Sequence, residues 1–185
     1  MVRKENSFYF VIGLILIASF SRIIPHYPNF TPIIAISLFG GKYFKNRTLA
    51  FFLPVFILWL SDLVINNFIL DYYKTFTFIY PGFYWQYFSI LLISFIGRNY
   101  INKISTSKLL GISISSSLVF FIISNFGVFV TSSIYPKDLN GLLLCYTAAI
   151  PFFWGTLSSS IIYTFSLFGI YKFIYQNKFK LLNNN

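Results

Sequence analysis

The sequence is poor in the residues from which most catalytic and metal sites are built. Its 185 residues include one cysteine (Cys145), one histidine (His26) and four acidic residues. A single cysteine excludes an intramolecular disulfide and a cysteine-cluster metal site, and a single histidine excludes a multi-histidine metal centre. Because the chain offers no nucleophile–base pair and no metal-binding set, we expect that it is not an enzyme and holds no cofactor.

A nucleotide-binding loop of the form Gly-x-x-x-x-Gly-Lys-Ser/Thr is also absent from the sequence. If ATP hydrolysis energises this chain, the ATPase must therefore be a partner protein. Internal repeats, low-complexity segments and a second separable domain are absent as well.

Apolar residues, in contrast, are abundant. Hydrophobic side chains make up 57% of the sequence, charged side chains only 10%, and the mean hydropathy is +0.72. A soluble domain of this length cannot bury so much apolar surface, so we expect the lipid bilayer to be its solvent. The net charge of +10 is scattered between apolar runs, which is typical of membrane flanks. We therefore expect no nucleic-acid partner.

Six apolar runs predict six transmembrane helices. A helix needs about 20 apolar residues to cross about 30 Å of hydrocarbon, and runs without polar alternation exclude barrel strands. The first run resembles a signal peptide but lacks a convincing cleavage site, so we interpret it as a retained span. The second is short. The predicted spans are 8–24, 31–45, 48–70, 80–97, 109–131 and 154–175.

The predicted fold class is thus all-α: a polytopic membrane protein with six transmembrane helices. A single six-span domain is expected over residues 1–176, followed by a short basic and polar cytoplasmic tail over 177–185. Eleven of the fourteen basic residues fall at the termini and in the second–third and fourth–fifth connections. The positive-inside rule then places both termini in the cytoplasm of a protein of the inner cell membrane.

The segment 139–155, "LNGLLLCYTAAIPFFWG", does not fit this count. A seventh span there would move the basic C-terminal end to the outside. We expect a helix at the outer interface, or a re-entrant piece that leads into the last span.

Most polar residues within or near the spans then share the outer side. Asp62 lies in the third span, and a carboxylate in lipid costs about 2.5–3.5 kcal/mol, so it should face the bundle interior with a partner. Arg22, near the outer end of the first span, is the proposed partner. Two alternatives stay open: Arg22 extends to outer headgroups, or Asp62 serves a structural pair or helix cap only.

The connection "PHYPNFTP", residues 25–32, predicts a stiff non-helical loop, because each proline fixes its own φ and restricts the residue before it. Thr31 and Pro32 should open the second helix, whose N-terminus favours anions. We expect this loop to hold its shape at an external pocket. The predicted substrate-binding residues are Arg22, His26, Asn29, Asp62, Asn66, Trp85, Asn125 and Tyr135.

Two frequent residue types are not interpreted as ligand sites. Aromatic residues reach 23%, but isoleucine, asparagine and lysine are frequent too, which indicates an AT-rich genome. Ser113, Ser117 and Ser124 recur on one face of the fifth helix, and we interpret this stripe as a close helix contact.

Five stretches carry a family resemblance: "PHYPNFTPIIAISLFGG", "WLSD", "FFIISNFGVFV", "YPKDLNGLLLCYTAAIPFF" and "LFG". In this order they resemble an uncharacterised family of small bacterial integral membrane proteins, over roughly residues 20 to 170. That family is similar to the S components of energy-coupling factor (ECF) vitamin transporters, which capture substrate in an outward pocket. The resemblance implies an ECF-type transmembrane coupling subunit and ATPases as partners. The Ala-xxx-Ala surface of S components is missing from the first span, "VIGLILIASFS".

The leading hypothesis is therefore a membrane subunit that binds a small, vitamin-like nutrient from the outer face for uptake with a separate energising module. The alternative is a non-transporting scaffold or assembly subunit of the cell envelope, in which the outer polar cluster is an interface. Saturable uptake or a retained small molecule favours the first, and stable association with envelope machinery alone favours the second.

Overall fold

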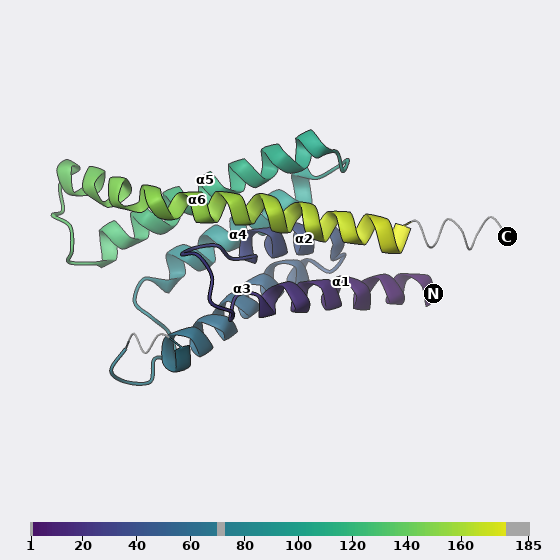
Figure 1. Cartoon of the computed structure of the whole chain (residues 1–185), viewed down its shortest axis with the longest axis horizontal. Helices are drawn as coiled ribbons and strands as arrows, with labels where there is room; N and C mark the ends of the chain where they lie inside the picture. The colour runs from purple at the N-terminus through teal and green to yellow at the C-terminus, as the bar shows by residue number, and fades with distance from the viewer. Residues whose placement is uncertain (1, 70–72, 177–185) are drawn as a thin grey trace.

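A computed structural model describes residues 2–69 and 73–176 of the chain. All regular secondary structure in these ranges is helical, which confirms the all-α prediction (Figure 1). Two helices continue as π-helical turns, η1 (Ile65–Ile69) after α3 and η2 (Tyr171–Gln176) after α6. The α-helices are α1 (Val2–Phe20), α2 (Ile33–Tyr43), α3 (Arg47–Val64), α4 (Phe83–Tyr100), α5 (Thr106–Thr131) and α6 (Leu139–Ile170). The predicted tail over 177–185 lies outside the described residues.

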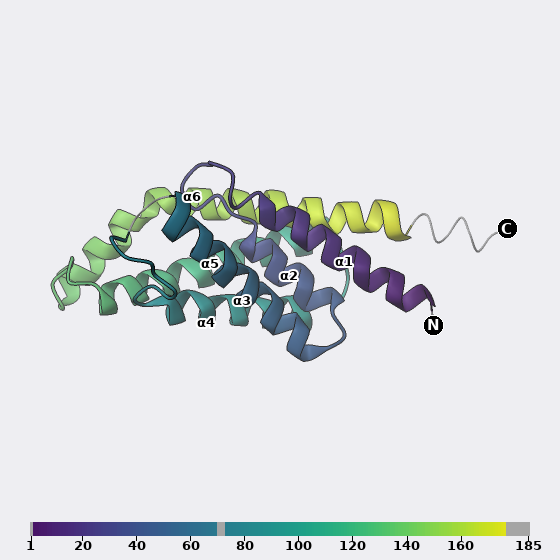
Figure 2. The ribbon, with the colours of Figure 1, turned by 90° about the horizontal axis from the view of Figure 1, so that it is seen from below.

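The helices run up and down in one bundle, so consecutive connections alternate between its two ends (Figures 1 and 2). The start of α1, the α2–α3 and α4–α5 connections and the last turn of α6 share one end. We call it the basic end, because seven described lysine and arginine side chains gather there. They are Lys42, Lys45, Arg47, Arg98, Lys103, Lys108 and Lys172.

Three helical segments are long and apolar enough to cross a membrane: Arg47–Ile69, Thr106–Thr131 and Leu139–Ile174. Only 28–33% of the residues in their most apolar stretches are buried inside the protein. Large side chains such as Ile17, Phe52 and Ile122 are more than half exposed, at 71%, 58% and 54%. Apolar faces that point outward are expected of a helical bundle whose solvent is lipid.

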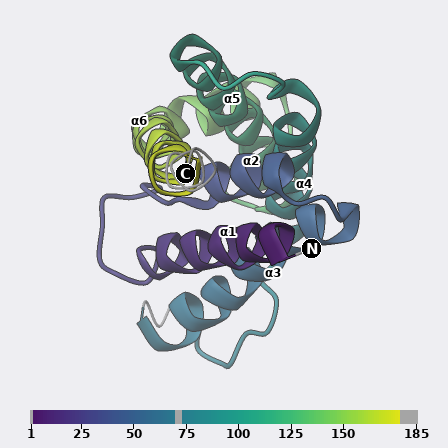
Figure 3. The same cartoon turned by 90° about the vertical axis from the view of Figure 1, so that its right-hand side faces the viewer.

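The shortest helix, α2, occupies the centre of the bundle (Figure 3). Its residues from Ile33 to Gly41 are all buried, with α1, α3, α4, α5 and α6 around it. A helix that is apolar on every side is stable only when other helices enclose it. Eleven residues rise about 16 Å, roughly half of the hydrocarbon thickness, so α2 fills only part of the bundle's length.

Two glycines allow α2 and α4 to approach closely. A Cβ atom on Gly41 would collide with the backbone of Ser94 in α4, and a Cβ on Gly97 would collide with the backbone of Leu38 in α2. Small residues at such crossings bring helix backbones together, and in lipid this packing replaces the hydrophobic driving force. The crossing fixes the central helix against the bundle.

Two predicted features differ from the structure. Arg22 lies outside the first helix, because α1 ends at Phe20. The chain then forms a turn before Pro25, with backbone hydrogen bonds such as that from the Arg22 N–H to the Ser19 carbonyl. The segment 139–155 forms neither a separate helix nor a re-entrant turn but is the first half of the continuous helix α6. Asp138 caps that helix by accepting the Gly141 N–H at 2.7 Å, and Pro151 is accommodated inside it.

Replacing Gly97 with alanine should lower the melting temperature of the purified protein, because the new methyl group would force α2 and α4 apart. We expect a loss of about 1–3 kcal/mol in the free energy of unfolding, as is usual for overpacking. Gly169→Ala in α6 is the matched control, because no atom lies within 4 Å of the position that its new methyl group would take. Equal melting temperatures for the two variants would contradict the close crossing.

Candidate functional site

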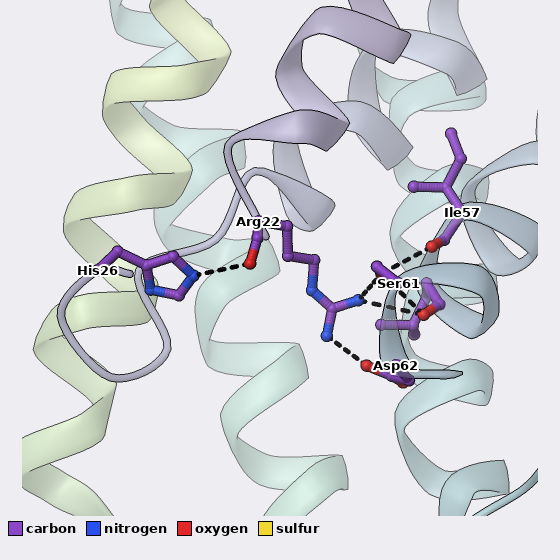
Figure 4. A network of polar contacts seen from close by, with 6 residues as sticks. Arg22, His26, Ile57, Ser61 and Asp62 are labelled. Carbon is purple, nitrogen blue, oxygen red and sulfur yellow. Dashed lines mark hydrogen bonds and ion pairs between the residues drawn. The ribbon is translucent and has the colours of Figure 1, made fainter. Parts of the chain in front are cut away.

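A buried ion pair joins the α1–α2 connection to α3 (Figure 4). Arg22 Nη2 lies 2.5 Å from Asp62 Oδ1, and both side chains are only 12% exposed. Arg22 Nη1 donates to Ser61 Oγ at 2.5 Å and to the Leu58 carbonyl at 3.2 Å. The predicted Arg22–Asp62 pair is therefore confirmed, and it forms because a buried charge requires an opposite charge.

The end of α3 is shaped to receive the guanidinium group. The Ser61 hydroxyl donates back to the Ile57 carbonyl at 2.7 Å, which leaves its oxygen free to accept from Arg22. Directly after this turn, α3 gives way to the π-helical turn η1. Such π-turns occur often at functional sites. Here the turn lets Asn67 bond the backbone of Thr77, which anchors the α3–α4 connection.

Three buried polar atoms beside the pair have no hydrogen-bond partner among the described residues. They are Arg22 Nε, Asp62 Oδ2 and Tyr80 Oη. Burial raises the pKa of Tyr80 far above its usual value, and the nearby Asp62 carboxylate adds to this shift. Tyr80 therefore remains a neutral hydroxyl group near the Asp62 carboxylate, whose charged form it stabilises.

A cavity of about 200 Å³ lies next to the ion pair, enclosed by the α1–α2 connection and by α2 to α6. Its polar lining comes from four different elements, the α1–α2 connection, α4, α5 and α6, so no single helix carries the site. The polar lining residues are Arg22, Asn29, Thr31, Gln86, Ser124, Asn125 and Thr156.

The rest of the cavity lining is aromatic and aliphatic. Phe121 and Phe153 meet edge to face, with ring centroids 5.1 Å apart. Such an arrangement offers both ring faces and ring edges to a flat ligand. The apolar lining residues are Ile33, Ile34, Leu58, Phe120, Phe121, Val128, Ala149, Phe152 and Phe153.

The α1–α2 connection is non-helical, as predicted, and is seated on α6. Asn29 adopts a positive φ of 59°, which asparagine tolerates better than most residues. Gly155 of α6 leaves room for the carbonyl of Pro28, because a Cβ atom there would collide with it. This seat turns Asn29 and Thr31 toward the cavity. The N-cap of α2 is Pro32, without the expected Thr31 side-chain cap.

Of the eight predicted binding residues, three line the cavity: Arg22, Asn29 and Asn125. Asp62 lies one contact away, through Arg22. The structure does not bring the other four to the cavity wall.

His26 is exposed, and its ring bonds two nearby carbonyls, that of Tyr27 at 2.9 Å and that of Arg22 at 3.3 Å. Figure 4 shows the second of these contacts. The Trp85 ring packs at Gly127 and against Phe126, with ring centroids 5.2 Å apart. Asn66 is half-buried in η1, and Tyr135 is half-buried in the α5–α6 connection.

Several lining residues were not predicted as site residues. Ser124 was assigned to the close-contact stripe, but only Ser113 and Ser117 are fully buried, and Ser160 of α6 donates to the Ser113 carbonyl at 3.3 Å. Ser124 instead lines the cavity beside Asn125. The spacing of Phe121 and Asn125, one helical turn apart, was the signal that could have identified this face.

Residues 3–182 match the model of a family of unknown function, DUF6580, and the chain belongs to this family. No curated protein and no solved structure matches the chain. The described residues contain no group of three or more His, Cys, Asp and Glu side chains that could hold a metal ion.

A double-mutant cycle tests the ion pair. Arg22→Met and Asp62→Asn should each lower the free energy of unfolding by about 3–5 kcal/mol, because each leaves one buried charge without its partner. The double variant should lose much less than the sum of the two single losses. Unfolding of the purified protein in mixed micelles measures all three values.

Asp138→Asn is the matched control for this cycle, because asparagine can keep the cap of α6 and the change should cost little. Strictly additive losses in the cycle would show that Arg22 and Asp62 do not interact.

Proposed function

We propose that this member of the DUF6580 family is a membrane subunit that binds a small, vitamin-like nutrient and is not itself an enzyme. It takes the solute from the outer face of the inner membrane for uptake by a separate energising module. The observation that supports this proposal most is the cavity that polar side chains from four elements line together with several phenylalanines.

The lining of the cavity suits a compact, partly polar ligand. Its volume of about 200 Å³ is below the roughly 300–1,000 Å³ of pockets for drug-sized ligands. The amide groups of Asn29, Gln86 and Asn125 can bind polar ligand atoms, and Phe121 and Phe153 can contact a ring. The N-terminal end of α2, at Ile33 and Ile34, favours a negatively charged ligand group.

The proposed orientation follows from charge. By the positive-inside rule, the basic end of the bundle faces the cytoplasm, together with both ends of the chain. The cavity lies away from the basic end and is lined in part by the α1–α2 connection, and it would receive solute from outside. In this arrangement the chain traverses the membrane six times, with the loop before α2 completing the path that this short helix cannot cover.

The resemblance to ECF S components supports a division of labour. The chain lacks a nucleotide-binding loop, so a transmembrane coupling subunit and ATPases of the ECF type would supply the energy. The missing Ala-xxx-Ala surface on the first helix means that the coupling contact would use other residues.

Purification in a gentle detergent, followed by mass spectrometry of the small molecules and proteins that stay bound, tests the proposal. We expect a stoichiometric small molecule, and Asn125→Ala should reduce its retained amount about tenfold, because one buried hydrogen bond is lost. The matched control is Asn66→Ala, at a residue that does not line the cavity.

If the purified protein retains envelope proteins but no small molecule, the proposal is overturned in favour of the scaffold alternative. Equal ligand loss in the Asn125 and Asn66 variants would show that the ligand does not occupy this cavity.

A further inference from the structure

A second concave site lies at the basic end of the bundle, opposite the proposed solute cavity. This pocket of about 480 Å³ is formed by the C-terminal end of α2, the α2–α3 connection and the end of α4. Its lining includes three cations, Lys42, Lys45 and Arg98, and two further polar side chains, Tyr43 and Asn99. We call it the basic pocket.

The cation from α4 is held in place by the α2–α3 connection. Arg98 Nη1 donates to the Phe44 carbonyl at 3.0 Å, and Nη2 donates to the Lys45 carbonyl at 3.2 Å. The close crossing at Gly41 fixes α2 against α4 directly beneath these bonds. Carbonyl groups orient a guanidinium but do not neutralise it, so Arg98 is positioned and keeps its full charge.

No described carboxylate balances these charges. The acidic side chains that the structure describes are Asp62, which pairs with Arg22, and Asp138, which caps α6. Both lie toward the other end of the bundle. The buried Tyr43 hydroxyl, in addition, has no hydrogen-bond partner among the described residues. Three cations and a hydroxyl donor around one hollow attract an anion that accepts several hydrogen bonds, which is the chemistry of a phosphate group.

The position of the basic pocket indicates the source of this phosphate. Seen from the basic end, the α2–α3 connection lies at the edge of the bundle (Figure 3), so a lipid molecule beside the bundle would reach it. Basic pockets at the ends of transmembrane helices on the cytoplasmic side are suited to anionic headgroups. We infer that the basic pocket binds the phosphate of an anionic phospholipid. This inference does not depend on the proposed solute cavity.

Native mass spectrometry of the full-length protein, with phosphatidylglycerol or phosphatidylcholine added, tests the inference. We expect selective retention of phosphatidylglycerol. The Lys42→Gln/Lys45→Gln variant should weaken that binding by about fivefold for each lysine removed. It leaves Arg98 and its two carbonyl bonds in place, so the fold should be preserved, and an unchanged melting temperature confirms this.

Lys103→Gln/Lys108→Gln is the matched control, because it removes the same charge from the same end outside the basic pocket. The inference predicts that this variant keeps its preference for phosphatidylglycerol. An equal loss in both double variants would show diffuse surface charge only and overturn the inference. Binding of inorganic phosphate without any preference for phosphatidylglycerol would also overturn it, because the site would then serve a soluble anion.

Discussion

The ion pair between Arg22 and Asp62 is the interaction on which the cavity end of this bundle depends. A carboxylate within an apolar helix must find a counter-charge, and Arg22 reaches it only if the chain turns inward directly after α1. That turn carries the rest of the α1–α2 connection to the middle of α6 and seats it there at Gly155. Asn29 and Thr31 thereby come to line the cavity.

The length of α2 explains why there is a cavity to line. This helix fills the centre of the bundle from the basic end but covers only about 16 Å of it. The glycine crossing at Gly41 and Gly97 holds it against α4, so it cannot slide outward to fill the remaining space. The space beyond its first residues, Ile33 and Ile34, is bounded by the inner faces of the longer helices α5 and α6.

Sequence patterns were sufficient for the features with a strong energetic signature. The helices were located because a span must be long and continuously apolar, and the partner of Asp62 was found because few charges lie at its depth. The same uniform apolarity hid the cavity wall, since Phe121 and Phe153 cannot be distinguished by pattern from residues that face lipid. The segment 139–155 was expected to be an interfacial helix or a re-entrant piece, but Pro151 is accommodated within α6, and Gly155 makes room for a loop. Trp85 was expected at the cavity, and its contact with Gly127 depends on a helix crossing that no local spacing encodes.

The central claim is that the cavity beside the ion pair faces the outside of the cell. Cysteine labelling of intact cells tests it most directly, with the native Cys145 replaced by alanine and a membrane-impermeant maleimide as the reagent. The account predicts that a cysteine at His26, in the exposed part of the α1–α2 connection, reacts rapidly, whereas one at Lys103 in the α4–α5 connection reacts only after the cells are opened. Labelling of the Lys103 position alone in intact cells would contradict it, because the cavity would then face the cytoplasm.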